Sequence, residues 1–199
     1  NVVYTEPIGK KGQLQLNYSP SYSKSKADLE VFKYDYAGDK YSLFVDSLSN
    51  KFDNIITKHS TGLSYRVGDR DNMFSVGLSY QYTALNSDQS YPYAANVRLN
   101  FNNLLPNLMW RKKINSKNSI RVFYRANTNT PSVSQLQDVI NNSDPLYVSK
   151  GNPNLKQQVG NMLSTRYTYT NTAKSKSFFA NIFLLQNSNY ITNAIYNIK

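Results

Sequence analysis

Residues 73–84 read MFSVGLSYQYTA, and this stretch decides the fold. Every second residue from Phe74 to Ala84 is apolar or aromatic, and the residues between them are Ser, Gly, Gln and Thr. Successive side chains of a β-strand point to opposite faces of its sheet, so this period of two predicts a strand with one apolar and one polar face.

The same period recurs along the chain. It is clear in 12–22 (GQLQLNYSPSY), 119–127 (SIRVFYRAN) and 159–170 (VGNMLSTRYTYT). Two segments are less regular. Residues 177–186 (SFFANIFLLQ) are apolar on both faces, and 100–114 carries Pro106, which indicates a bulge or an edge-like position. The one plausible helical stretch is 132–140 (SVSQLQDVI).

The connections between these segments are of two kinds. Those around 68–71 (GDRD), 115–118 (NSKN) and 171–176 (NTAKSK) are short and polar, as tight hairpins require. The connections at 85–96 and 129–157 are long. Short turns at one end of a sheet and long loops at the other are typical of outer-membrane barrels.

This pattern predicts an all-β fold, an antiparallel up-and-down meander of about seven to eight long strands that forms part of a larger transmembrane β-barrel. Residues 1–199 form one partial barrel domain, with a long outer loop at about 130–157. Residues 24–54 form a single outer excursion that contains a hairpin at 29–45. Residues 1–8 form the lower end of an eighth strand, and the seven full crossings are 12–23, 55–67, 73–85, 97–114, 119–129, 158–170 and 177–190.

Composition excludes several kinds of site. The 199 residues contain no Cys and one His, His59, which excludes disulfides, thiolate metal sites and any site that needs two imidazoles. No stretch approaches the ~20 apolar residues of a membrane helix. The net charge of +11 is spread along the chain, which indicates a solvated surface more than a nucleic-acid or anionic-lipid partner.

The apolar face meets either lipid or the core of a soluble sandwich. Strands of 11 to 18 residues exceed the usual ~3–10 of globular sheets. Tyrosine and tryptophan favour the interface between lipid and water, and several lie close to the short turns. Both features favour lipid. The candidate aromatic girdle comprises Tyr65, Trp110, Tyr167 and Tyr169.

Residues 123–158 resemble the barrel of TonB-dependent outer-membrane receptors of the type common in Bacteroidetes. The matching motifs are Tyr124-Arg125, Pro131-Ser132, Gln135-Leu136, Asp144-Pro145 and Gly151 to Lys156, whereas Gln157-Gln158 stands where that family has Pro-Glu. Residues 4–26, 62–66 and 101–110 also look like this family.

The resemblance implies active uptake of a scarce solute across the cell outer membrane of a Gram-negative bacterium. It implies outer-membrane lipid, a plug domain of the same full-length chain and TonB as partners, with a surface lipoprotein as an optional further partner. No catalysis, cofactor, metal or nucleic acid is expected. The alternative is a non-transporting outer-membrane adhesion or structural barrel. A hydrolase would need a nucleophile, a base and an orienting group, and one His fits this poorly.

Two sets of residues are candidates for a specific role. Gly151, Asn152, Pro153, Asn154, Leu155 and Lys156 combine turn formers with an anchoring Leu, which predicts a stiff structural turn and not a ligand clamp. This turn sets the register of strand 158–170, and we expect 131–156 to lie ordered against the outer rim. Three arginines are expected on the lumen side, against plug carboxylates, solvent or an anionic substrate: Arg121, Arg125 and Arg166.

Overall fold

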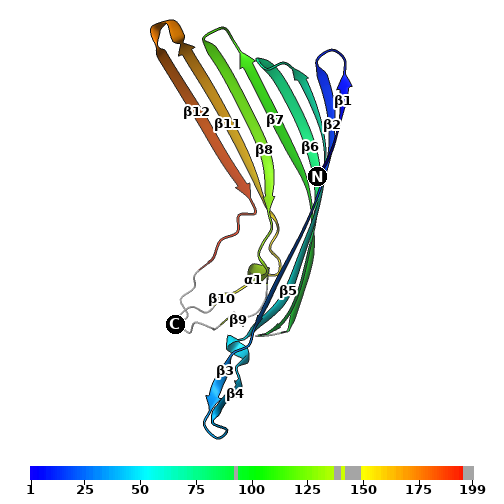
Figure 1. The fold of residues 1–199 in the computed structure, drawn as a ribbon, viewed down its shortest axis with the longest axis vertical. Helices are drawn as coiled ribbons and strands as arrows, with labels where there is room; N and C mark the ends of the chain where they lie inside the picture. The colour runs from blue at the N-terminus through cyan, green and yellow to red at the C-terminus, as the bar shows by residue number, and fades with distance from the viewer. Residues whose placement is uncertain (92–93, 137–139, 142–148, 195–199) are drawn as a thin grey trace.

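The computed structural model describes residues 1–91, 94–136, 140–141 and 149–194, and its main feature is one eight-stranded sheet (Figure 1). All neighbouring strands are antiparallel and follow chain order, which confirms the all-β meander. In order across the sheet, the strands are β1 (Val2–Ile8), β2 (Gly12–Leu29), β5 (Asn50–Gly68), β6 (Asn72–Tyr91), β7 (Ala95–Lys113), β8 (Asn118–Asn129), β11 (Gln158–Asn171) and β12 (Lys176–Ser188).

Short elements occupy the connections. The hairpin predicted within 29–45 is present as β3 (Phe32–Asp35) and β4 (Lys40–Phe44), at the end of the sheet opposite the short turns (Figure 1). Of the helix predicted at 132–140, the structure shows α1 (Val133–Leu136); 137–139 lie outside the described residues, and Ile140 is wrongly included because it begins a strand. The remaining elements are the 3-10 turns η1 (Asp46–Leu48) and η2 (Thr172–Lys174), and the two-residue strands β9 (Ile140–Asn141) and β10 (Ser149–Lys150).

The prediction of a long connection at 85–96 is wrong. Strand β6 continues to Tyr91, and β7 begins at Ala95, which pairs with Gln89. The polar run 86–89 resembles a loop in sequence, but an antiparallel ladder is bonded through the backbone and needs no apolar side chains. For the same reason β2 and β5 run six and five residues beyond their predicted ends, so that Leu29 pairs with Asn50.

Pro106 marks the place where β7 and β8 separate. Pairing between these strands runs from Lys113 opposite Ser119 to Asn107 opposite Arg125, and stops beside Pro106. Proline has no N–H to donate to a ladder. This confirms the edge-like position predicted for Pro106. Farther from the short turns than Pro106, the end of β8 stays paired with β11.

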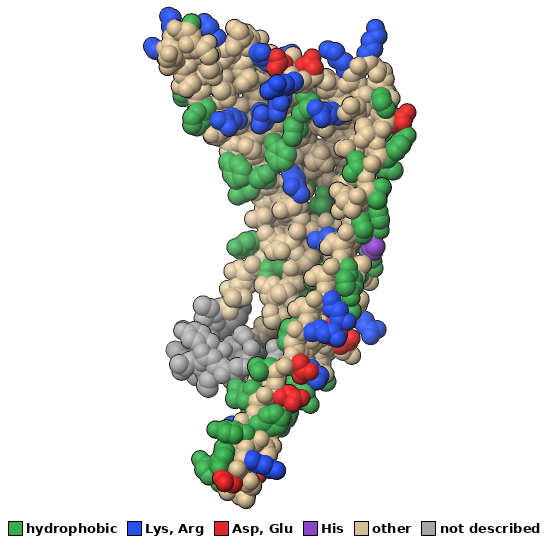
Figure 2. Space-filling view, in the orientation of Figure 1, with side chains coloured by type: hydrophobic (Ala, Val, Ile, Leu, Met, Phe, Trp, Pro, Cys, Tyr) green, Lys and Arg blue, Asp and Glu red, His purple; other side chains and the backbone are tan. Residues whose placement is uncertain are grey.

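The two faces of the sheet have different chemistry, as predicted. Directly paired residues share a face, and the registers place Leu78, Tyr80, Val122, Tyr124, Leu163 and Tyr167 together on one face, opposite Arg121, Arg125 and Arg166. On the apolar face the side chains of Leu63, Leu78 and Leu104 are 51%, 48% and 62% exposed. Figure 2 shows apolar side chains along the right-hand flank, where β1, β2 and β5 lie.

The other face is concave (Figure 1), and hydrogen bonds attach both described ends of the β8–β11 connection to it. Gln81 Nε2 donates to Thr128 Oγ1 at 2.6 Å, which ties the end of β8 to β6. Gln157 Nε2 donates to Thr130 Oγ1 at 2.7 Å, and Asn103 donates to Gln157. The two ends of this connection, at Thr128 to Thr130 and at Gln157, are thus attached to the hollow side of the sheet, and the expected order of 131–156 against the outer rim stays a prediction.

In the described structure four hairpins close the short-turn end, and those around 68–71, 115–118 and 171–176 lie at the predicted places. Asn115 Oδ1 accepts the backbone N–H groups of Lys117 and Asn118, both at 2.9 Å. The β11–β12 turn uses η2 and a left-handed Ser175. Gly68 has a φ of 106°, a conformation that glycine adopts readily and other residues rarely. The short turns are therefore stabilised by local hydrogen bonds and include residues with a positive φ.

Candidate functional site: an arginine-lined hollow

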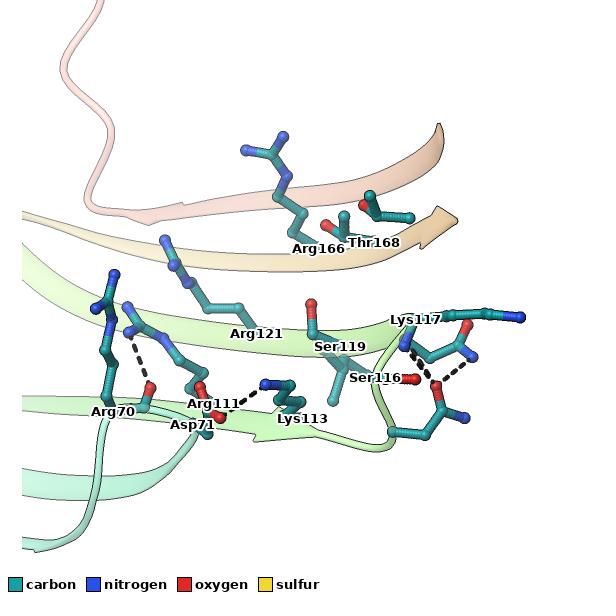
Figure 3. A pocket seen from close by; sticks show the side chains of 14 residues that line it. Arg70, Asp71, Arg111, Lys113, Ser116, Lys117, Ser119, Arg121, Arg166 and Thr168 are labelled. Carbon is teal, nitrogen blue, oxygen red and sulfur yellow. Dashed lines mark hydrogen bonds and ion pairs between the residues drawn. The ribbon is translucent and has the colours of Figure 1, made fainter. Parts of the chain in front are cut away.

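Three arginines form a row across the concave face at the short-turn end. Arg111 of β7 pairs directly with Arg121 of β8, and Arg121 pairs with Arg166 of β11. Neighbouring strands lie ~4.8 Å apart, so the three side chains leave the sheet side by side. Figure 3 shows their guanidinium groups on the same side of the sheet, together with that of Arg70. We call Arg111, Arg121 and Arg166 the arginine row.

A second row lies two residues nearer the turns. Lys113 pairs with Ser119, and Ser119 pairs with Thr168, so an ammonium and two hydroxyl groups face the same side as the arginine row. Both rows line a hollow of about 360 Å³. Its lining contains six cationic side chains and a single carboxylate, that of Asp71.

Among the described residues, one of these six cations is paired with a carboxylate. Lys113 forms an ion pair with Asp71, with 2.8 Å between its Nζ and the carboxylate Oδ2. Arg111 donates from Nη1 to the backbone oxygen of Arg70 at 3.3 Å, while its Nε is buried without an acceptor. Arg166 lies over the ring of Phe179 at 5.4 Å. No ion pair between an arginine and a carboxylate is found among the described residues.

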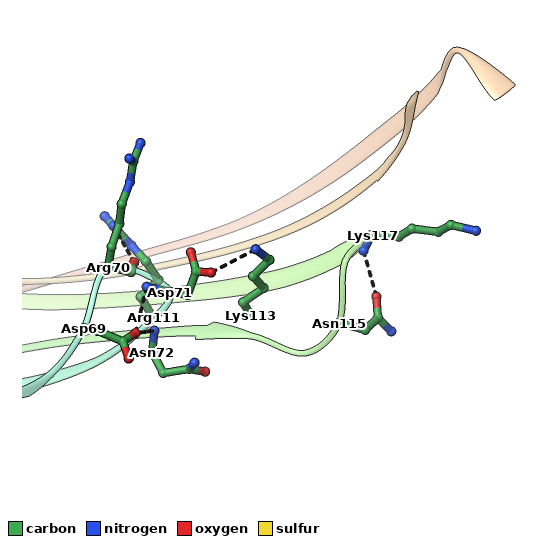
Figure 4. A network of polar contacts seen from close by, with 8 residues as sticks. All are labelled: Asp69, Arg70, Asp71, Asn72, Arg111, Lys113, Asn115 and Lys117. Atoms are coloured by element: carbon green, nitrogen blue, oxygen red, sulfur yellow. Dashed lines mark hydrogen bonds and ion pairs between the residues drawn. The ribbon is translucent and has the colours of Figure 1, made fainter. Parts of the chain in front are cut away.

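In the neighbouring β5–β6 turn, an aspartate carboxylate accepts hydrogen bonds from the backbone of the same turn (Figure 4). Asp69 Oδ1 accepts the backbone N–H groups of Asn72 at 2.9 Å and of Asp71 at 3.1 Å, and Lys11 lies 3.3 Å from Oδ2. These donors favour the charged carboxylate. The Asn72 N–H, the Lys11 ammonium and the Asp71 N–H hold the pKa of Asp69 below its ordinary value of 3.8. The Asp69 carboxylate is thus occupied by these donors, and it does not line the hollow of the arginine row.

The structure places the three arginines predicted for the lumen on the concave face and brings two of them together. Arg121 and Arg166 line the hollow, whereas Arg125 pairs with Met162 and lies outside it. Arg70, Arg111 and Lys113 were not predicted from the sequence. Arg111 and Lys113 could have been placed by extending the strand parity of β8 across the predicted 115–118 turn, whereas Arg70 lies in the β5–β6 turn, where strand parity gives no signal.

The segment Gly151 to Lys156 adopts a turn. Leu155 N donates to Asn152 O at 3.3 Å, and Asn154 N donates to the Asn152 side chain at 2.9 Å. Asn152 N in turn donates to Gln135 O at 2.7 Å, which attaches this turn to α1. The turn geometry agrees with the sequence prediction, and its structural role stays a prediction. The Asp144-Pro145 motif lies outside the described residues.

The described residues contain no group of three His, Cys, Asp or Glu side chains that could hold a metal ion.

No helix in the described part of the chain is long and apolar enough to cross a membrane.

The long strands, the exposed apolar face, the polar concave face and the short turns define the class: the wall of an outer-membrane β-barrel. The profile of the outer membrane protein beta-barrel family matches residues 1–199, and the chain belongs to this family. The comparison with curated proteins gave no match.

Proposed function

We propose that this chain forms the wall and outer loops of a TonB-dependent receptor in the outer membrane of a Gram-negative bacterium, where it takes part in active uptake of a scarce solute. The observation that carries the proposal is the open shape of the sheet. Eight strands form a trough, and in the described structure β1 and β12 pair on one side only. Every residue of both edge strands is exposed.

Bare strand edges are not stable in a membrane, because each unpaired backbone group costs several kcal/mol there. Further strands must therefore pair with β1 and β12. A barrel of eight strands has an interior that its own side chains fill, while barrels of about 22 strands enclose a lumen large enough for a plug. The shallow trough supports the larger kind, and the resemblance of residues 123–158 supports a TonB-dependent receptor.

The proposed partners follow from the two faces. Outer-membrane lipid covers the convex apolar face, and a plug domain of the same full-length chain fills the concave side. TonB acts through the plug, and a surface lipoprotein caps the outer loops. In this proposal the chain performs no covalent chemistry.

The test compares binding with uptake in cells that carry the full-length receptor. Cells are given a mixture of small solutes, and mass spectrometry follows which solutes bind to the surface and which leave the medium. Deleting TonB, or collapsing the proton gradient, should stop depletion of one solute while leaving its surface binding intact. Depletion that continues without TonB contradicts the proposal. Binding to surfaces without any uptake indicates the adhesion or structural barrel.

A further inference from the structure

We propose that the arginine row and the row beside it form a binding site for a small multivalent oxyanion, of the diphosphate or tricarboxylate class. The proposal rests on the proposed function, because the imported solute, or an anionic group that competes with it, would bind at the short-turn end of the lumen.

The first argument is the missing counter-charge. Like charges directly opposite each other on neighbouring strands destabilise a sheet, yet the registers place Arg111, Arg121 and Arg166 in one line. Asp71, the single carboxylate in the hollow, already pairs with Lys113. The hollow therefore holds a strong net positive charge that its own lining does not neutralise, and an anion must supply the balance.

The second argument is the kind of donor. Guanidinium groups present planar, fixed N–H pairs that match carboxylate and phosphate oxygens, often two at a time. Ser119 and Thr168 add hydroxyl groups on the same floor. Arg111 lines the hollow with a single hydrogen bond, from Nη1 to the backbone oxygen of Arg70, so its guanidinium group keeps further N–H donors for a ligand. These donors suit oxyanions better than halides.

The third argument is the spacing, which decides the valence. Donors are repeated every ~4.8 Å across the strands and every ~6.8 Å along them, because same-face residues are two apart. A ligand with a single oxyanion group contacts only part of this grid. A ligand with two or three such groups, on a short skeleton, engages both rows at once and fits a hollow of about 360 Å³.

The test uses the purified full-length protein in detergent micelles, with pyrophosphate and citrate as probes and acetate as the monovalent reference. Isothermal titration should show citrate or pyrophosphate binding at least tenfold more tightly than acetate. The double variant Arg121→Gln/Arg166→Gln should weaken this binding tenfold or more. The matched control is Arg125→Gln, on the same strand and face but outside the hollow, and it should keep the affinity. Heat-modified gel mobility verifies that each variant is folded.

The same chemistry has a second source, the carboxylates of another segment of the protein inside the barrel. In that case the added anions do not bind. Instead, an Arg121→Lys variant treated with carbodiimide forms an amide between the introduced amine and a carboxylate other than Asp71, which peptide mass spectrometry identifies. Either result supports an oxyanion site. Unchanged citrate binding in the double variant, or neither binding nor the new amide, overturns it.

These outcomes are separate from the test of uptake. TonB-dependent depletion without anion binding at the arginine row removes the site and leaves the proposed function. Anion binding that depends on Arg121 and Arg166, in a protein whose uptake does not need TonB, removes the proposed function and leaves the site.

Discussion

Single residues at the short-turn end carry strict backbone requirements, and Gly68 is the clearest. Its φ is 106°, and a Cβ at this position would lie 2.0 Å from the backbone oxygen of Asn72. We predict that Gly68→Ala lowers the free energy of unfolding by about 1–3 kcal/mol, the usual range for a strained backbone position. The urea midpoint of the protein in micelles measures this loss.

Gly9 provides the control for that prediction. It has a φ of 66°, and a Cβ there meets no atom within 4 Å. Gly9→Ala should therefore cost less than Gly68→Ala, because it pays for conformation without a clash. Equal losses for the two variants would show that the contact with Asn72 is unimportant.

Asp69 gives the same end of the molecule a dependence on pH. Its pKa is lowered in the folded protein, so its stabilising effect is present above the ordinary, unfolded-state pKa of 3.8 and is lost as pH falls through the lower folded-state value. We predict that the urea midpoint decreases below pH ~4, and that Asp69→Asn flattens this decrease. An Asn side chain still accepts the two backbone N–H groups but loses the charge attraction to Lys11. An identical acid slope in both proteins would mean that Asp69 does not contribute.

The candidate site was only partly predictable at this scale. Arg121 and Arg166 could be placed on the polar face from the alternation within their own strands. Arg111 lies in a segment interrupted by Pro106 and followed by Lys112 and Lys113, so its parity was not assigned. Which arginines stand in line depends on the register between strands, and hairpin register is set by the number of residues and the geometry of each turn.

Among the elements, the turn that precedes β11 combines Asn152 as a cap with Pro153 as the first central residue. Proline restricts the unfolded chain, so Pro153→Ala should lower stability by about 0.4–1 kcal/mol and reduce the amount of assembled barrel. Heat-modified gel mobility gives the folded amount, and solute uptake is then expressed per folded receptor. Normal folding combined with a collapse of solute affinity would make this segment a binding site instead of a structural turn.

Gln157 fixes the long connection to the concave face. It is 3% exposed, accepts from Asn103 and donates to Thr130, so its loss leaves two polar groups without a partner. We predict that Gln157→Ala costs about 1–3 kcal/mol in the docking of this connection. Limited proteolysis should cut 131–156 at least several-fold faster, with the barrel still resistant. Gln15, exposed on the same face, provides the control as Gln15→Ala, and equal proteolysis of both variants would contradict the prediction.

The centres of the strands were predictable and their outer ends were not. Alternation identified the cores of β2, β6, β8 and β11, and the turn residues identified the hairpins around 68–71, 115–118 and 171–176. Residues 24–29 and 86–91 extend the ladder with side chains such as Lys, Ser, Asp and Gln, which carry no apolar period. At these outer strand ends, pairing depends on backbone hydrogen bonds and on ion pairs such as Lys26 with Asp53, at 3.0 Å. A hydrophobic pattern is absent there and gives no signal for a strand.

On the scale of the whole molecule, the sheet reverses the distribution expected of a soluble protein. Its convex face exposes apolar side chains, and the best buried side chains on the concave face include the polar Gln81, Thr83 and Ser87, at 7%, 0% and 1% exposure. A sheet with this polarity is stable when lipid covers the convex side and the concave side surrounds water or protein. The longer strands β2, β5, β6 and β7 then extend beyond the lipid-covered region into the outer hairpins.

Neighbouring residues on β6 allow this arrangement to be tested directly. Leu78 points to the convex face, where it is 48% exposed among Leu63 and Pro106, and Ser79 points to the concave face opposite Gly62. A charged side chain on the lipid face of a barrel costs about 2–4 kcal/mol near the middle of the bilayer, while the lumen face tolerates it. We predict that Leu78→Arg lowers the free energy of unfolding from liposomes by this amount and reduces the inserted fraction on gels. Ser79→Arg should remain within about 1 kcal/mol of the parent protein, because the charge reaches the polar interior. Equal behaviour of the two variants, or a larger loss for Ser79→Arg, would mean that the convex face does not meet lipid.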